Sequence, residues 1–184
     1  MRVIESALDG LVVFENKRFA DERGFFEEFF NQTQFGSAVA ARGFVQVNHS
    51  HSLPGVIRGL HFQLTPPQGK LVGVIAGRIW DVAVDIRTGS PTLGRHFAAE
   101  LSAENGRMLW IPAGFAHGFC VMGDSPADVL YLVDEIYNPR GESGILWNDS
   151  DLNVPWPLGG EPIVSARDRR QPSWSEFVNK SAQA

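Results

Sequence analysis

Residues 106–117 read Gly-Arg-Met-Leu-Trp-Ile-Pro-Ala-Gly-Phe-Ala-His, and this stretch decides the fold class. The apolar run before Pro112 is typical of a strand, Pro-Ala-Gly supplies a turn, and His117 follows where the chain enters the next strand. Similar runs rich in Val, Ile, Leu and Phe recur along the chain, separated by Gly, Pro, Asn and Asp. The sequence therefore predicts a mainly β protein, an antiparallel jelly-roll barrel with a few short helices.

The clearest predicted hairpin joins residues 70–76 to residues 79–86 through a turn at Gly77-Arg78. Residues two apart in a strand point to the same side, so Asp81, Ala83 and Asp85 share one face of the second arm. Two aspartates on one face need either solvent or cationic partners. Solvent exposure of this face is the favoured interpretation.

Helix signals are few. Residues 31–41 are predicted to form one helix, capped by Asn31 or Thr33, and a second helix is predicted in the tail from Ser173. No Pro/Gly-rich linker divides the chain. We therefore expect residues 1–184 to form a single domain of the barrel type, with N-terminal strands and a C-terminal segment that packs on the barrel.

Charge and composition exclude some classes of function for this protein. The 184 residues carry a formal net charge of −5, which argues against a nucleic-acid surface built on bulk positive charge. A few Arg and Lys in a cleft can still attract an anionic small ligand. No long apolar segment indicates a signal peptide or a membrane span, and Cys120 is the single cysteine. These features predict a cytoplasmic protein without nucleic-acid or membrane partners.

The stretch ending at His117 resembles the second sequence motif of the cupin superfamily. The first cupin motif normally supplies two histidines and a glutamate as metal ligands. Residues 55–63, Gly-Val-Ile-Arg-Gly-Leu-His-Phe-Gln, provide the first histidine as His61, but Gln63 stands in place of the second and no Glu follows. Two imidazoles alone make a poor closed metal site, so no metal is predicted. His49 and His51 form a rival pair on one side of a strand, and a hydrogen-bonded or solvent-facing pair is the favoured interpretation.

The whole chain resembles the dTDP-4-dehydrorhamnose 3,5-epimerase family. The matching motifs follow one another in order almost from end to end, at residues 21–26, 46–48, 58–63, 69–71, 81–87, 89–92, 111–119, 147–149 and 165–168. The resemblance implies a homodimeric jelly roll that needs no metal or organic cofactor. It also implies a dTDP-linked 4-keto-6-deoxy sugar as substrate. This chain has Arg167 where the family often has Lys, and Ile136-Tyr137 where it often has two tyrosines.

The resemblance also implies site residues. His61 is the expected base, supported by Asp168, and Tyr131 is the expected acid. The implied contacts to the nucleotide sugar are Arg23, Glu28, Gln46, Asn48, Arg58, Lys70, His117, Tyr137, Glu142 and Arg167. Phe26 and Tyr137 are expected to flank the base by stacking.

Epimerisation beside a ketone requires these residue types. A base removes a carbon-bound proton, a cation stabilises the enolate oxygen, and an acid returns a proton to the other face. An imidazole, with an ordinary pKa of roughly 6.5, is largely neutral near pH 7 and suits the base. A phenol suits the acid, and Lys70 or Arg58 suits the enolate oxygen.

Three alternatives stay open from sequence. A mono-epimerase acting at carbon 3 or carbon 5 would use the same residues. A non-catalytic cupin would bind a nucleotide sugar without exchanging its protons. A metal-dependent cupin would need a metal ion for activity.

Overall fold

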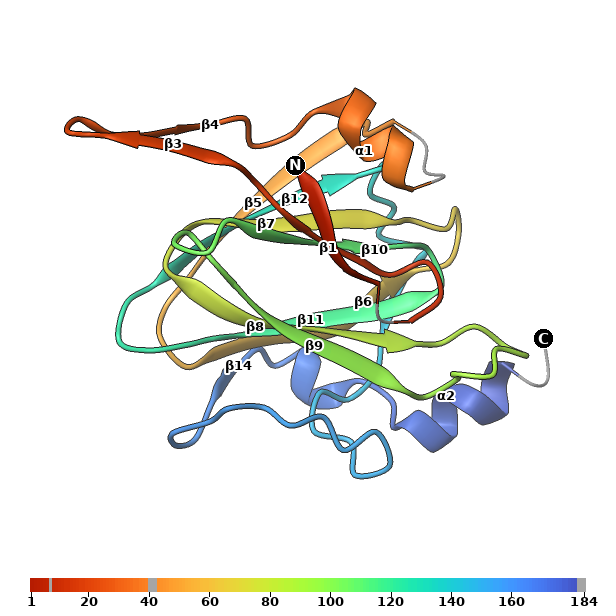
Figure 1. Ribbon diagram of the computed structural model, residues 1–184. Coiled ribbons are helices and arrows are strands. Elements are labelled where there is room, and N and C mark those ends of the chain that lie inside the picture. The colour runs from red at the N-terminus through yellow and green to blue at the C-terminus, as the bar shows by residue number, and fades with distance from the viewer. Residues whose placement is uncertain (7, 40–42, 182–184) are drawn as a thin grey trace.

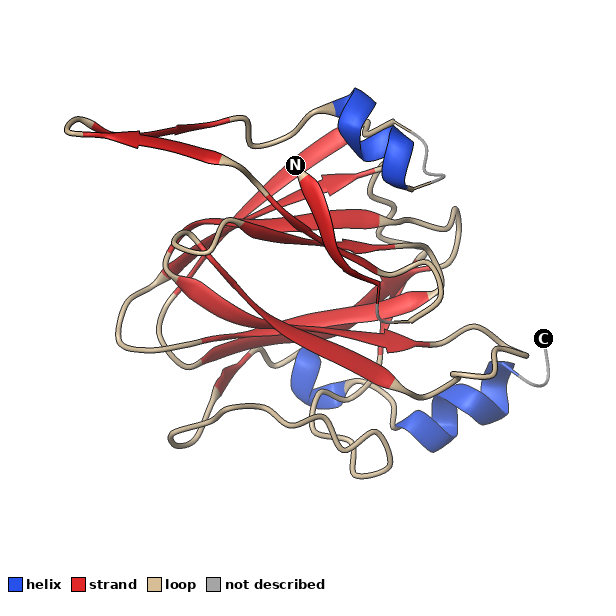
Figure 2. Ribbon diagram, in the orientation of Figure 1, coloured by secondary structure: helices blue, strands red, loops and turns tan. Residues whose placement is uncertain are grey.

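The computed structural model describes residues 1–6, 8–39 and 43–181. Two antiparallel sheets face each other and form the body of the molecule (Figures 1 and 2). The structure therefore confirms the prediction of a mainly β fold of the jelly-roll kind. None of the helices in the described ranges is long and apolar enough to cross a membrane.

Strands from distant parts of the chain alternate within each sheet. The first sheet has the order β1 (Arg2–Ser6), β2 (Val12–Glu15), β10 (Arg107–Ile111), β7 (Lys70–Ala76), β12 (Ala127–Val133) and β5 (Gln46–Ser52). The second has the order β13 (Glu142–Gly144), β6 (Val56–Gln63), β11 (Phe115–Val121), β8 (Arg78–Asp85) and β9 (His96–Ser102), with β14 (Ile163–Val164) parallel to β6.

The main core fills one part of the space between the sheets. Inward-facing side chains of both sheets meet there, among them Val72, Ile79, Leu109, Phe119 and Val129. Burial of such side chains contributes roughly 1.5–3 kcal/mol each. The core fixes the separation of the sheets and so the width of the site described below.

The predicted hairpin of residues 70–86 is wrong, although both of its strands exist. β7 belongs to the first sheet and β8 to the second, so the two strands do not pair with each other. The chain crosses between the sheets at Gly77, which has a φ of +71°. A Cβ at this corner would lie 2.3 Å from the carbonyl oxygen of Pro126, so only glycine fits.

The predicted solvent exposure of Asp81 and Asp85 is also wrong, because both side chains are buried. Their face of β8 points between the sheets. The opposite face, with Val82 and Val84, is covered by the C-terminal segment. Strand periodicity placed the two aspartates together correctly, but it does not reveal that both faces are covered.

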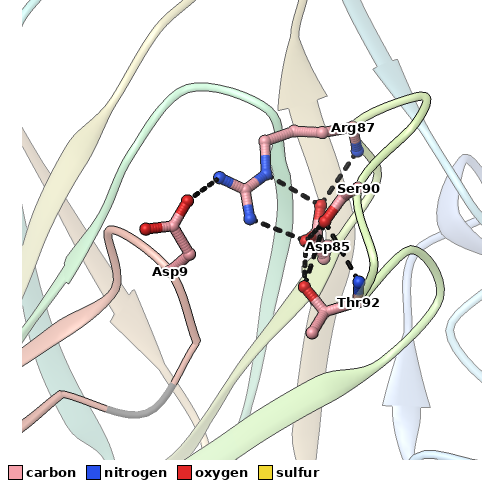
Figure 3. Close-up of polar contacts among 5 residues, drawn as sticks. All are labelled: Asp9, Asp85, Arg87, Ser90 and Thr92. Carbon is pink, nitrogen blue, oxygen red and sulfur yellow. Dashed lines mark hydrogen bonds and ion pairs between the residues drawn. The ribbon is translucent and has the colours of Figure 1, made fainter.

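Asp85 organises the turn that follows β8 (Figure 3). Its carboxylate accepts hydrogen bonds from the backbone and guanidinium of Arg87 and from the hydroxyls of Ser90 and Thr92. The Arg87 guanidinium also reaches Asp9 at 3.4 Å. The turn is thereby tied to the N-terminal part of the chain.

The C-terminal segment lies against the outer face of the second sheet (Figure 1). It contains a 3-10 turn at Asp168–Arg170 and α2 (Trp174–Ser181), whose Phe177 packs against Phe62 of β6 with ring centroids 5.4 Å apart. The helix predicted from Ser173 is therefore confirmed. On the other side of the molecule, α1 (Gln32–Ala38) buries Phe35 against the first sheet.

The N-terminal cap of α1 is Asn31, whose side-chain oxygen accepts hydrogen bonds from the backbone of Thr33 and Gln34. The helix ends at Ala38, earlier than predicted, and Val39 is extended. Residues 40 and 41 of the predicted helix lie outside the described residues.

A two-stranded hairpin, β3 (Arg18–Asp21) and β4 (Gly24–Glu27), projects away from the two sheets (Figure 1). Its aromatic side chains are solvent-exposed, with Phe26 71% exposed. Within this one chain, the described residues leave the hairpin's apolar surface largely uncovered.

Candidate active site

A pocket of about 240 Å³ lies between the two sheets. Both sheets contribute polar side chains to its wall, which is unusual for the space between two packed sheets. The lining residues are Asn48, Ser50, Arg58, His61, Gln68, Lys70, His117, Phe119, Tyr131, Val133, Tyr137 and Glu142.

His61 and Asp168 form a hydrogen-bonded pair at this pocket. The distance from Nε2 of His61 to Oδ1 of Asp168 is 2.7 Å. Asp168 is 3% exposed and stands at the start of the 3-10 turn of the C-terminal segment. The packing of that segment on β6 therefore brings the carboxylate to the histidine.

Gly59, two residues before His61, allows β6 and β11 to approach closely. A Cβ at Gly59 would lie 2.6 Å from the Cα of Gly118 on β11, so a side chain would push β6 and β11 apart. The backbone N–H of Gly59 also points toward Oδ2 of Asp168, at 3.4 Å. Each oxygen of the Asp168 carboxylate thus has a donor, His61 for Oδ1 and the Gly59 backbone for Oδ2.

Burial alone would raise the pKa of Asp168. The hydrogen bond and the charge of His61, with the backbone N–H of Gly59 and the hydroxyl of Ser165, outweigh that effect and keep the pKa below its ordinary value. Asp168 is therefore an anion at neutral pH. An anion here fixes a proton on Nε2 of His61 and leaves Nδ1 as the basic nitrogen.

A second His–Asp pair lies beside the first. His117 on β11 is the register partner of His61 on β6, and its Nε2 is 2.7 Å from Oδ1 of Asp81. Burial lowers the pKa of His117 and raises that of Asp81, so the charged form of each is disfavoured. Within the described part of the chain, Oδ2 of Asp81 has no hydrogen-bond partner.

Tyr131 faces the histidines from the other sheet. Its hydroxyl is 2.9 Å from Oγ of Ser50 on the neighbouring strand β5, and its ring centroid is 6.1 Å from that of His117. Burial raises the pKa of the phenol well above its ordinary value. The hydroxyl therefore stays protonated at neutral pH and is available as a proton donor.

Lys70 places a cation in the same pocket. Burial lowers the pKa of its ammonium group to about 8, although the negative charges of Asp81, Glu142 and Asp134 oppose the shift. The group is still mostly protonated at pH 7. A partly desolvated cation next to His61 and Tyr131 suits the stabilisation of an oxyanion.

Polar groups at the mouth of the pocket are linked to one another. The Tyr137 hydroxyl donates to Oε2 of Glu142 at 2.8 Å, and the Arg167 guanidinium pairs with the same oxygen at 2.7 Å. Arg58 donates to Oγ of Ser52 at 2.9 Å and lines the pocket wall. Gln46 is bonded to Asn48 and to the backbone N–H of Tyr137.

The structure brings together most of the residues expected at the site. Three of them, Arg23, Phe26 and Glu28, lie elsewhere within this chain. Arg23 and Phe26 belong to the projecting hairpin, where Arg23 pairs with Asp21, and Glu28 follows the hairpin and accepts a hydrogen bond from Gln34.

Sequence reasoning missed two polar residues at or beside the pocket, Ser50 and Asp81, that strand periodicity could have indicated. Ser50 shares the inward face of β5 with Gln46 and Asn48, as residues two apart must. Asp81 lies on the inward face of β8 and was assigned to solvent instead. Gln68 and Val133 also line the pocket and carried no sequence signal, and Phe119, the last residue of the matching motif 111–119, lines it as well.

His49 and His51 lie on the outer face of β5 and do not reach the pocket. Nε2 of His49 and Nδ1 of His51 are 2.8 and 3.1 Å from the same oxygen of Asp128. This agrees with the hydrogen-bonded pair expected from sequence. Within the described residues, no group of three or more His, Cys, Asp or Glu side chains could hold a metal ion.

Comparisons with known proteins agree with this geometry. The family model described as dTDP-4-dehydrorhamnose 3,5-epimerase matches residues 5–176. The chain belongs to the dTDP-4-dehydrorhamnose 3,5-epimerase family. The family member from Shigella flexneri is 51% identical over 170 residues, which cover 91% of this chain and 93% of that protein.

A solved structure of the family has the same fold. The dTDP-6-deoxy-D-glucose-3,5-epimerase of Legionella pneumophila, in complex with dTDP-4-keto-L-rhamnose, is 42% identical. It superposes with a TM-score of 0.91 and covers 96% of either chain. The Neisseria gonorrhoeae relative is 47% identical over 99% of this chain, which spans only 55% of that longer protein.

Proposed function

We propose that this chain epimerises dTDP-4-keto-6-deoxy-D-glucose at carbons 3 and 5 to give dTDP-4-keto-L-rhamnose. The observation that carries the proposal is the His61–Asp168 pair, which faces a pocket that Tyr131 enters from the opposite sheet. A base on one side and a proton donor on the other are what inversion at a carbon requires. Membership of the family and the ligand of the Legionella structure support the choice of substrate.

In this proposal Nδ1 of His61 takes the proton bound to the carbon beside the ketone. The electron pair of that C–H bond forms a double bond to the carbonyl carbon, and the π pair of the carbonyl moves onto its oxygen, which becomes an enolate oxygen. Asp168 stabilises the imidazolium that forms, because its carboxylate is buried and already bonded to Nε2. The Lys70 ammonium stabilises the enolate oxygen electrostatically.

Tyr131 completes the inversion. Its phenol gives a proton to the opposite face of the enolate carbon. The carbon–carbon double bond supplies the electron pair of the new C–H bond, and a pair on the enolate oxygen re-forms the carbonyl. Burial favours the protonated phenol before transfer, and Ser50 is placed to donate to the phenolate after it. Repetition at the second carbon requires the sugar to turn within the pocket.

The proposal includes a homodimer in which the projecting hairpin completes the site of the partner subunit. The expected substrate-binding residues Arg23, Phe26 and Glu28 do not line the pocket of their own chain. Exposed apolar side chains lie on the hairpin, at Phe19, Phe25 and Phe26, and at the start of the edge strand β5, at Val47 and the preceding Val45. Exposed apolar surface of this kind marks contact sites between proteins.

Proton NMR in deuterated water tests the function directly. The wild-type protein is expected to introduce deuterium at both carbon 3 and carbon 5 of the 4-keto sugar. His61→Ala should abolish exchange at both carbons while dTDP-sugar binding, measured by calorimetry, stays within about threefold, since the base adds little to ground-state binding. Tyr131→Phe should allow exchange with much less inversion, because proton removal survives and delivery to the other face does not.

Each alternative has its own outcome in that experiment. Label at one carbon only would assign the chain as a mono-epimerase. Tight binding without exchange on any 4-keto sugar would make it a binding protein. Activity that is lost to a chelator and restored by a metal ion would support a metal-dependent cupin.

A further inference from the structure

Gln63 occupies the position where a metal-binding cupin carries its second histidine. It is the last residue of β6, two residues after His61, and only 4% of its surface is exposed. A buried amide must satisfy its donors and acceptor within the protein. The hydrogen-bond partners of this amide therefore show which interactions Gln63 makes at the position of the histidine.

All the polar groups of Gln63 are used on backbone atoms. Nε2 donates to the carbonyl of Pro66 at 2.9 Å and to that of Ile136 at 3.1 Å. Oε1 accepts from the backbone N–H of Asn138 at 2.7 Å. Gln63 thus binds the residues on either side of Tyr137.

Tyr137 needs this support because its own side chain is not held by burial. The residue is 45% exposed, yet its ring lines the pocket. Its hydroxyl bonds to Glu142 and its backbone N–H donates to Gln46 at 3.0 Å. The ring is therefore held at its hydroxyl by Glu142, and the direction in which it leaves the chain is set by the backbone on the two sides of Tyr137.

The loop around Tyr137 has little freedom to move by itself. The side chain of Asn138 donates to the carbonyl of Thr65 at 2.7 Å, and the side chain of Gln68 donates to that of Glu135 at 2.7 Å. A Cβ at Gly141 would lie 1.9 Å from the same Thr65 oxygen, so the two segments pack without a gap. The buried amide of Gln63 joins the same two segments, since it bonds to Pro66 on one side and to Ile136 and Asn138 on the other.

We infer that Gln63 is a positioning residue that fixes Tyr137 as one wall of the pocket and so keeps the sugar bound through both epimerisations. The inference rests on the proposed function. After the first inversion the sugar must turn to present its second carbon to His61 without leaving. When Tyr137 is held rigidly, it keeps the sugar in the pocket during that turn. When Tyr137 is loosened, the singly inverted sugar is released.

Gln63→Met tests the inference, since methionine is close in size and makes none of the three hydrogen bonds. We expect kcat/KM for double exchange to fall about tenfold or more, as for other small misplacements at a site. We also expect sugar labelled at one carbon to accumulate in solution, with at least about a threefold higher ratio of singly to doubly labelled product. If Gln63→Met does not fold, Gln63→Glu keeps the size and the acceptor for Asn138, and should change the ratio in the same direction.

Asn105→Leu is the matched control. Asn105 is also an amide bonded only to backbone atoms, since it donates to Glu100 at 3.0 Å and accepts from Ser102 and Arg107 at 3.0 and 2.9 Å. It lies outside the pocket. Asn105→Leu should lower the melting temperature, as Gln63→Met does, and leave the product ratio unchanged.

A double-mutant cycle with Tyr137→Ala decides whether Gln63 acts through Tyr137. If it does, adding Gln63→Met to Tyr137→Ala changes the ratio no further. If the two substitutions changed the product ratio independently, so that their effects multiplied in the double variant, the inference would be overturned. So would a wild-type product ratio in Gln63→Met while the wild-type protein exchanges both carbons. Absence of exchange in the wild-type protein would instead overturn the proposed function.

Discussion

His61 depends on a carboxylate that lies 107 positions further along the chain. The pair with Asp168 decides which ring nitrogen carries the proton. It also supplies the negative charge that an imidazolium intermediate needs. At the scale of single residues, the proposed mechanism therefore rests on one contact between β6 and the C-terminal segment.

Asp168→Asn tests that contact, because the amide keeps the size of the side chain and loses its charge. We expect kcat to fall roughly ten-thousandfold with little change in melting temperature, as for an orienting aspartate in other His–Asp pairs. Ser165→Ala is the control, because it removes the hydroxyl that accepts from the Asp168 backbone and leaves the hydrogen bond between the carboxylate and His61 in place; it should cost less than about tenfold. Near-normal turnover in Asp168→Asn would contradict the role given to the carboxylate.

Lys70 gives the reaction a predicted pH dependence. Its pKa is lowered to about 8 by burial, so the ammonium group is lost as the pH rises through that value. We expect kcat/KM to fall on the alkaline side with a midpoint near pH 8. Lys70→Arg should be slower but should lack this limb, since arginine stays charged throughout the range. An unchanged alkaline limb in Lys70→Arg would assign the titration to another group.

At the scale of elements, the turn after β8 depends on the buried carboxylate of Asp85 (Figure 3). Burial alone would raise its pKa, but the hydrogen bonds from Arg87, Thr92 and Ser90 outweigh burial and hold the pKa far below its ordinary value. We expect Asp85→Asn to reduce the free energy of unfolding by about 3 kcal/mol at pH 7, because Arg87 then loses its buried partner.

The sign of the pH effect follows from the lowered pKa of Asp85. The unfolded chain, with a carboxyl pKa of roughly 3.9, takes up a proton before the folded protein does as the pH falls. The stabilisation is therefore complete above about pH 5 and is lost as the pH falls below 4 toward the folded-state value. Urea unfolding at several pH values should show the difference between wild type and Asp85→Asn shrinking in acid. A difference that grows in acid would contradict this assignment.

At the scale of the whole molecule, the projecting hairpin of β3 and β4 separates Arg23 from the pocket of its own chain. Coexpression of His61→Ala and Arg23→Ala chains tests whether the hairpin serves the partner subunit. Each variant alone should have little activity. In an equal mixture about a quarter of all sites would combine an intact His61 with an intact Arg23 from the other subunit.

Recovery of that fraction of wild-type activity, in a particle that light scattering sizes as a dimer, would support the proposed assembly. The same mixture would stay inactive if Arg23 served the site of its own chain. A monomeric wild-type protein would contradict the homodimer altogether.

The sequence by itself determined the fold class and most of the pocket. Strand-forming runs and Gly/Pro turns are local signals, and motifs such as Arg58–Gln63 have fixed spacing along one strand. The family resemblance that these motifs carry then implied His61, Lys70 and Tyr131 as site residues before their positions in space were known. The helix capped by Asn31 was foreseen for the same reason, since capping is a local interaction.

Only the tertiary structure decided which faces are covered and which strands pair. β7 and β8 look like a hairpin but belong to different sheets, because the corner at Gly77 turns the chain across the molecule. Asp81 was assigned to solvent, yet it lies between the sheets beside His117. Strand periodicity states which residues share a face, whereas burial of that face depends on segments far away in sequence that pack against it.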